Sequence, residues 1–177
     1  MELRYLAMKG SVKKVIDFAQ ILDLRKVAAD LRSDLPHLPF LLELTVLGMS
    51  RYSIANLRLD DIKDGVIYWS SRRHTDLASK LSEGQAQILD DYLSWRRTRN
   101  TKSSILLLVK RSIIKKTFDD YFFPIKPERA RSDIRSLGRE IDLDFVLEIP
   151  DIHRSVARYL SESRVDSKFI KKHYKVG

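Results

Sequence analysis

The residue types in this chain that could act on a phosphate group gather near its C-terminal end. His153, Arg154 and Arg158 fall within the segment PDIHRSVARYL at 150–160. A guanidinium group binds phosphate oxygens bidentately and stays charged, so it anchors a phosphate rather than giving it a proton. A histidine can donate a hydrogen bond to the same group. Because Arg154 and Arg158 are four residues apart, a helix here would present both on one side.

Positive charge dominates the composition. The 177 residues hold 33 Lys and Arg against 24 Asp and Glu, so the formal net charge is +9. Each Lys or Arg that binds a phosphate of nucleic acid releases condensed counterions, so an excess of this size favours a polyanionic partner. We therefore expect the chain to bind nucleic acid.

Other classes of protein find little support in the sequence. No apolar run approaches the roughly 20 residues that a membrane-spanning helix needs, and the N-terminal segment does not have the pattern of a secretory signal. The absence of cysteine excludes disulfides and thiolate metal sites. We also find no phosphate loop, nucleotide-binding fingerprint or Ser-His-Asp arrangement. The sequence thus predicts a cytoplasmic protein without metal or other cofactor and without a membrane partner, folded as a single domain over 1–177.

Hydrophobic spacing divides most of the chain into helices. The expected helices cover 11–32 (as one helix or two), 40–49, 53–57, 84–97, 128–141, 150–163 and 166–174. The helix at 40–49 is apolar nearly all round and should be buried, and Ser53 is expected to cap the next one. Asp64-Gly65 marks a turn before the strand VIYWS at 66–70, with a second short strand beyond it. The apolar stretch 105–109 is either a strand or the lead into the next segment. The expected fold class is mainly α with a small antiparallel β-sheet.

Three segments in this order resemble the catalytic domain of the tyrosine recombinases, the phage-integrase family. LELTVLGMSRYSIANLRLDDI at 42–62 is similar to the family's apolar helix, Gly, Arg, short helix and LRW-DI. GVIYWSSRRHTDLASKLSEGQAQILDDYL at 65–93 is similar to its β-hairpin and the helix that follows. PDIHRSVARYLSESRVDSKFI at 150–170 is similar to its HDLRHTFATYLLESGVDLKTI pattern. The resemblance covers roughly residues 12–177.

The resemblance implies transesterification at a phosphate of double-stranded DNA. In the family, a tyrosine attacks the phosphorus while two arginines neutralise the non-bridging oxygens. A lysine on the hairpin protonates the leaving 5′ oxygen, and histidines assist the proton transfer.

Few of these reactive residues stand at the matching positions. Those positions hold Ser50 (with Arg51 next to it) for the first arginine, Arg72 for the lysine, Pro150 for the first histidine, His153 for the second arginine, Arg154 for the following histidine, and Val176 for the later His or Trp. The position of the nucleophile falls beyond Gly177. Tyr174 is a displaced candidate, although it aligns with an apolar helix position. The resemblance therefore implies that the fold is kept and the chemistry is lost.

Three functions stay open on these residues. The first is a DNA-binding protein without strand cleavage, with a structural, regulatory or segregation role or as an integrase remnant; its predicted DNA contacts are Arg51, Arg72, Arg73, His153, Arg154 and Arg158. The second is an active or trans-complemented recombinase, whose catalytic candidates are Arg51, Arg72, His153 and Tyr174. The third is a protein-interaction module that has lost DNA binding. The first two leave open a homo-oligomer or a partner protein on the DNA.

Overall fold

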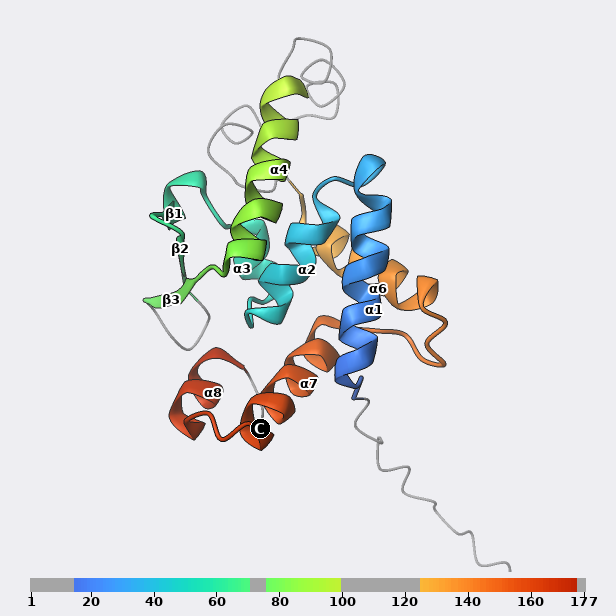
Figure 1. Cartoon of the computed structure of the whole chain (residues 1–177), viewed down its shortest axis with the longest axis vertical. Helices are drawn as coiled ribbons and strands as arrows, with labels where there is room; N and C mark the ends of the chain where they lie inside the picture. Colours follow the sequence, from blue (N-terminus) through green and yellow to red (C-terminus); the bar gives the residue numbers. More distant parts are fainter. Residues whose placement is uncertain (1–14, 71–75, 100–124, 175–177) are drawn as a thin grey trace, which may run out of the picture.

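The computed structural model describes residues 15–70, 76–99 and 125–174, which form seven α-helices and a three-stranded antiparallel sheet (Figure 1). The helices are α1 (Phe18–Asp30), α2 (Leu38–Val46), α3 (Arg51–Ala55), α4 (Glu83–Arg99), α6 (Pro127–Glu140), α7 (Ile149–Glu162) and α8 (Ser167–His173). The strands are β1 (Ile62–Lys63), β2 (Val66–Trp69) and β3 (Leu77–Lys80), and two 3-10 turns, η1 (Leu31–Ser33) and η2 (Leu59–Asp61), complete the elements. The expected fold class is confirmed. The segment 105–109 lies outside the described residues.

Helix α2 forms the centre of the molecule, as its uniformly apolar sequence predicts. Phe40, Leu41 and Leu44 are completely buried, and α1, α4, α6 and α7 surround the helix (Figure 1). Among the helices of the described ranges, even this apolar one is too short to cross a membrane, and none of the others is both long and apolar enough. The core is therefore built around one short buried helix.

A buried carboxylate on α2 joins three helices. Glu43 is 3% exposed and accepts two hydrogen bonds from Arg25 of α1, at 2.6 and 2.9 Å, in the bidentate arrangement that suits a guanidinium group. It also accepts a hydrogen bond of 2.8 Å from the side-chain amide of Gln85 in α4. Because an unpaired buried carboxylate is costly, these contacts fix α1 and α4 relative to α2.

The sheet is an antiparallel meander with strand order β1-β2-β3. Ile67 is paired with Ile62 on one side and Ser79 on the other, and Ile67 and Trp69 are buried while Tyr68 is exposed. Asp64 and Gly65 connect β1 and β2 with φ values of 51° and 71°, the left-handed conformation of a tight hairpin turn. The turn and the strand expected at these residues are both confirmed.

The short helix after α2 begins two residues earlier than the sequence predicts, and its N-cap lies three residues earlier. The N-cap of α3 is Ser50, whose Oγ accepts a hydrogen bond of 3.2 Å from the backbone N–H of Ser53. Ser53 lies inside the helix instead, and its hydroxyl donates to the carbonyl of Ser70 at 3.0 Å. The prediction of Ser53 as the cap was wrong because either serine satisfies the local preference, and the end of α2 determines which one takes the position.

Candidate functional site

Helix α8 packs against the turn between α2 and α3, and there Tyr174 meets the end of α2 and the histidine segment of α7. The hydroxyl of Tyr174 donates a hydrogen bond of 2.9 Å to the carbonyl of Val46, at the end of α2. The ring of His153 in α7 lies edge-on to the ring of Tyr174, with centroids 6.2 Å apart. The structure thus brings together residues that are more than a hundred positions apart in the sequence.

Gly48 makes this packing possible. Its φ of 94° is in the region that favours glycine, and a Cβ atom there would lie 2.5 Å from the carbonyl oxygen of His173. No side chain fits in that space, so the turn before α3 accepts α8 only with a glycine at this position.

An aromatic cluster fills the space beside this turn. It consists of Trp69, His153, Phe169, His173 and Tyr174. The ring of His173 stacks on Phe169 with a centroid distance of 4.1 Å and lies edge-on to Trp69 at 5.9 Å. All of the cluster except Phe169 is less than 9% exposed. Sequence reasoning missed Trp69 and His173 as members, although the spacing of Phe169 and His173 by four residues on one helix was a signal.

Burial decides what the tyrosine of this cluster can do. Tyr174 is 6% exposed, and burial raises the pKa of its hydroxyl to about 12. At neutral pH the phenol is therefore protonated, and its proton is directed at a backbone carbonyl. His153, which the sequence predicts as a phosphate contact, is buried beside it at 5% exposure. The cluster in this arrangement has the properties of a packed core.

The three predicted arginine contacts that the structure describes each bind a residue of their own helix. Arg51 donates to the hydroxyl of Tyr52 at 3.0 Å and its guanidinium lies 4.8 Å from the centre of that ring. Arg154 binds the carboxylate of Asp151, and Arg158 binds Glu162 at 2.8 Å. Arg158 is 68% exposed at its side chain, so its ion pair is readily exchanged for another anion. Arg72 and Arg73 lie outside the described residues.

A partly buried carboxylate with two arginine partners holds the beginning of α7. Glu148, the N-cap of α7, accepts hydrogen bonds from Arg131 at 2.7 and 2.8 Å and also binds Arg135, both in α6. The hydrogen bonds from Arg131, with those from Arg135, lower the pKa of Glu148 to about 2 in spite of its partial burial. The backbone N–H of Glu148 donates to Asp151, which completes a capping box. The pattern of acidic residues three apart before an apolar helix was the available signal for this cap.

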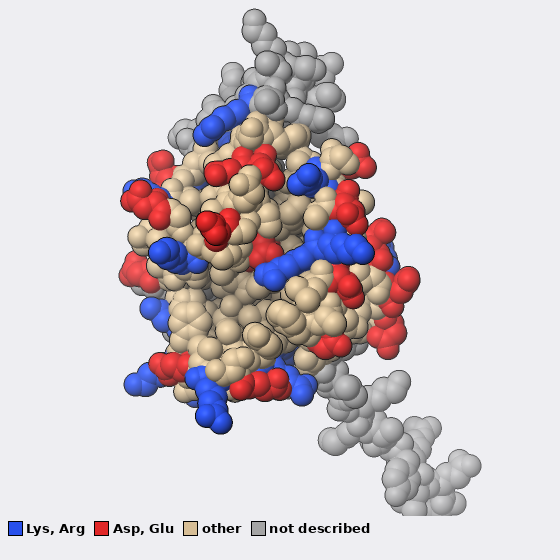
Figure 2. Space-filling view, in the orientation of Figure 1, with Lys and Arg blue, Asp and Glu red and all other residues tan. Residues whose placement is uncertain are grey.

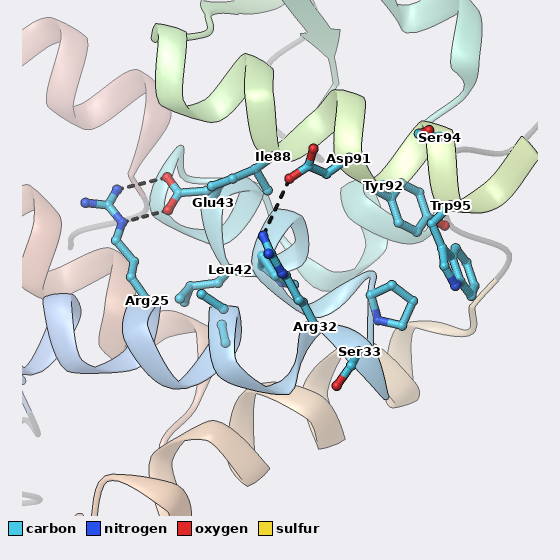
Figure 3. Close-up of a pocket in the computed structure, with 14 residues that line it drawn as sticks. Arg25, Arg32, Ser33, Leu42, Glu43, Ile88, Asp91, Tyr92, Ser94 and Trp95 are labelled. Atoms are coloured by element: carbon cyan, nitrogen blue, oxygen red, sulfur yellow. Dashed lines mark hydrogen bonds and ion pairs between the residues drawn. The ribbon is translucent and has the colours of Figure 1, made fainter.

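The described surface has one cleft lined by two arginines, both of them ion-paired, and another whose described lining has no Lys or Arg. The first, of about 560 Å³, lies between α1, α2 and α4; the pairs Arg25–Glu43 and Arg32–Asp91 cross it, and Tyr92 and Trp95 close one end (Figure 3). The second, of about 940 Å³, runs between α3 and the sheet, and its described lining contains no Lys or Arg. Within the described ranges no three His, Asp or Glu side chains are placed to hold a metal ion.

The net charge is distributed unevenly along the chain. The described ranges contain 21 Lys and Arg and 21 Asp and Glu, so the formal excess of +9 belongs entirely to residues 1–14, 71–75, 100–124 and 175–177. In agreement, the face shown in Figure 2 carries positive and negative side chains interspersed. The part of the chain that forms the described fold is therefore electrically neutral.

The order and packing of these elements define a fold of the tyrosine-recombinase kind. One solved structure that shows this is the crystal structure of XerA recombinase, which aligns with a TM-score of 0.68 at 15% sequence identity. The alignment covers 89% of this chain and 54% of that one, so the chain spans about half the length of the XerA structure. No protein-family model matches the sequence, and neither does any curated protein sequence. At this identity the likeness concerns the fold.

The close approach at Gly48 predicts a specific cost for a methyl group there. Gly48→Ala and Gly65→Ala both place alanine at a positive φ, which costs about 1–2 kcal/mol. Only Gly48→Ala also meets a backbone oxygen, and overpacking adds about 1–3 kcal/mol. Urea unfolding of both variants should therefore show a larger loss of stability for Gly48→Ala. Equal losses would contradict the packing of α8 on this turn, since nothing lies within 4 Å of a Cβ at Gly65.

The ion pairs of Glu148 predict a dependence of stability on acid pH. Because its pKa in the folded protein is about 2, against a usual value of 4.5, its contribution is complete above pH 4.5 and is lost as the pH falls through 2. The free energy of unfolding should therefore fall more steeply across this window in the parent protein than in Glu148→Gln. Glu162→Gln is the matched control, because its pair with Arg158 is mostly exposed, and it should keep the parent's slope.

Proposed function

We propose that this chain binds double-stranded DNA without cleaving it. The observation that carries the proposal is the buried aromatic cluster, in which Tyr174 donates its hydroxyl proton to Val46. The fold supports a task on DNA, and the cluster supports the loss of strand cleavage. A structural, regulatory or segregation role fits this combination.

The absence of cleavage follows from what the cluster does to each reactive group. A tyrosine that attacks phosphorus must reach the DNA and lose its proton, whereas Tyr174 is buried with a pKa of about 12. The first arginine position holds Ser50, which caps α3 and carries no charge. Pro150, at the position of the first histidine, has no titrating group. Because loss of single members of a catalytic constellation already costs several orders of magnitude in rate, these changes together leave no basis for transesterification.

DNA binding makes smaller demands on the same surface. Phosphate contacts need positive charge at the right place, and Arg and Lys both meet that need. The charge excess in residues 1–14, 71–75, 100–124 and 175–177 supplies such groups. Arg72 and Arg73, between β2 and β3, are among them. We infer that these segments provide much of the electrostatic attraction, and that Arg51, Arg154 and Arg158 of the neutral part contribute by exchanging their intramolecular partners for phosphates.

The dependence of binding on salt tests this proposal. The observed association constant for duplex DNA should fall linearly on a log–log plot, with a slope of about −0.9 per phosphate neutralised. Arg72→Ala with Arg73→Ala should weaken binding at low salt and make the slope less negative by about 1–2. The binding can be measured by fluorescence anisotropy on a labelled duplex.

Lys126→Ala with Arg139→Ala is the matched control, because it removes the same charge. Both residues belong to the ends of α6, a helix whose main contacts are with α3, α1 and α2. In this control variant, the slope of the association constant against salt concentration on the log–log plot should stay close to that of the parent protein. Absence of binding at low salt, or binding indifferent to salt, would overturn the proposal and favour a protein-interaction module.

A trapping experiment tests the loss of cleavage. Incubation with a nicked suicide duplex, which prevents religation, should give no covalent protein–DNA adduct, because Tyr174 is buried and its proton is directed at the carbonyl of Val46. The adduct would appear as a shifted band on a denaturing gel. A band that Tyr174→Phe abolishes would show an active recombinase instead, and a band that survives Tyr174→Phe would point to a different tyrosine; either result ends the non-cleaving interpretation.

A further inference from the structure

An apolar patch lies across α1 and α7, away from the residues discussed so far. Phe18 and Leu22 of α1 and Tyr159 of α7 are 45%, 47% and 46% exposed. The rings of Phe18 and Tyr159 stack with centroids 4.8 Å apart and an angle of 15° between their planes. We call these three residues the α1–α7 patch. Scattered exposed apolar residues are ordinary, whereas large ones in contact with one another mark an interaction surface.

The patch is a ridge along a helix. Phe18, Leu22 and the exposed Lys26 follow one another at intervals of four residues, so they lie on one face of α1. Their neighbour Tyr159 extends the ridge onto α7, which the hydrogen bond from the backbone of Ile16 to Ser155 holds beside α1. A ridge of this kind fits the groove beside the same ridge of another helix.

We propose that the partner is a second copy of this chain, with the two α1 helices antiparallel about a twofold axis at Leu22. Closed twofold pairs are the commonest oligomers, and they bury the same patch on both copies. Phe18 and Lys26 stand four residues on either side of Leu22, about 6 Å along the helix. The antiparallel arrangement therefore places Lys26 of one copy over the stacked rings of the other, where a cation is attracted.

Charge excludes the parallel alternative. In a parallel pair each residue faces its own copy, so Lys26 would face Lys26 and Asp30 would face Asp30. Like charges at such distances are unfavourable, whereas the antiparallel pair separates them. The spacing of Lys26 from the aromatic rings thus favours the antiparallel direction of the pair.

The pair should be weak in free solution. Three side chains on each copy bury less area than the standard interface of a stable complex, so the mass of the protein should rise with concentration rather than be fixed at that of a dimer. The inference concerns the free protein and is tested without DNA, so it stands or falls independently of the proposed function.

Cysteine crosslinking of the full chain tests the pairing and its direction, because the chain has no cysteine of its own. On oxidation, Leu22→Cys should form a disulfide-linked dimer about tenfold faster than Val146→Cys, since proximity in the pair raises the effective concentration of the thiols. Val146 is the control because it is 57% exposed and lies outside the patch. A mixture of Phe18→Cys and Lys26→Cys proteins should give the mixed dimer faster than Lys26→Cys alone gives its own dimer.

Three results would overturn the inference. Equal rates for Leu22→Cys and Val146→Cys would mean random collision, and faster crosslinking of Lys26→Cys alone than of the mixture would mean a parallel contact. Sedimentation of the unsubstituted chain as a monomer at every concentration would exclude the pair altogether. A mass that rises with concentration and ceases to do so in Leu22→Asp, with Val146→Asp unchanged, would support it.

Discussion

The backbone of Gly48 and the carbonyl of His173 lie so close together that no side chain fits between them, and the arrangement of the C-terminal third depends on this contact. It lets α8 rest on the turn between α2 and α3, which carries Tyr174 to the carbonyl of Val46. The ring of His153 then has an aromatic neighbour instead of solvent. One glycine with a left-handed backbone thus influences the surroundings of Tyr174 and His153.

The cluster that stabilises this junction also suppresses its reactivity. Packing the phenol of Tyr174 among aromatic rings raises its pKa and favours its neutral form, because burial penalises charge. The same packing contributes apolar burial at the junction of α7, α8 and the central strand β2. Glu148 is bound to Arg131 and Arg135 and fixes the N-terminal end of α7. Ion pairs therefore hold the start of this helix, and packing holds the rest of it.

Fold and charge are carried by different parts of the chain. The described ranges are formally neutral, and several of their ions are paired within the molecule, as Glu43 with Arg25 illustrates. The excess of positive charge is confined to the four segments outside them. A protein organised in this way can change its charged segments without changing its core, since surface charges away from buried pairs contribute little to stability. This separation is consistent with a fold that can be retained when the charged segments, and the function that depends on them, change.

Much of the fold could be predicted from short-range patterns in the sequence. The helices α4, α6, α7 and α8 lie within two residues of their predicted bounds, because hydrophobic period and capping depend on near neighbours; the Asp64-Gly65 turn is local in the same way. The choice between Ser50 and Ser53 as the cap of α3 could not be predicted from near neighbours, since it depends on where α2 ends. The burial of His153 and the locked hydroxyl of Tyr174 were beyond sequence patterns as well. Sequence alone determined which elements form and which reactive groups are present. The tertiary packing of α8 on the turn after α2 decided that His153 and Tyr174 are enclosed, because contacts between residues far apart in the chain leave no local pattern in the sequence.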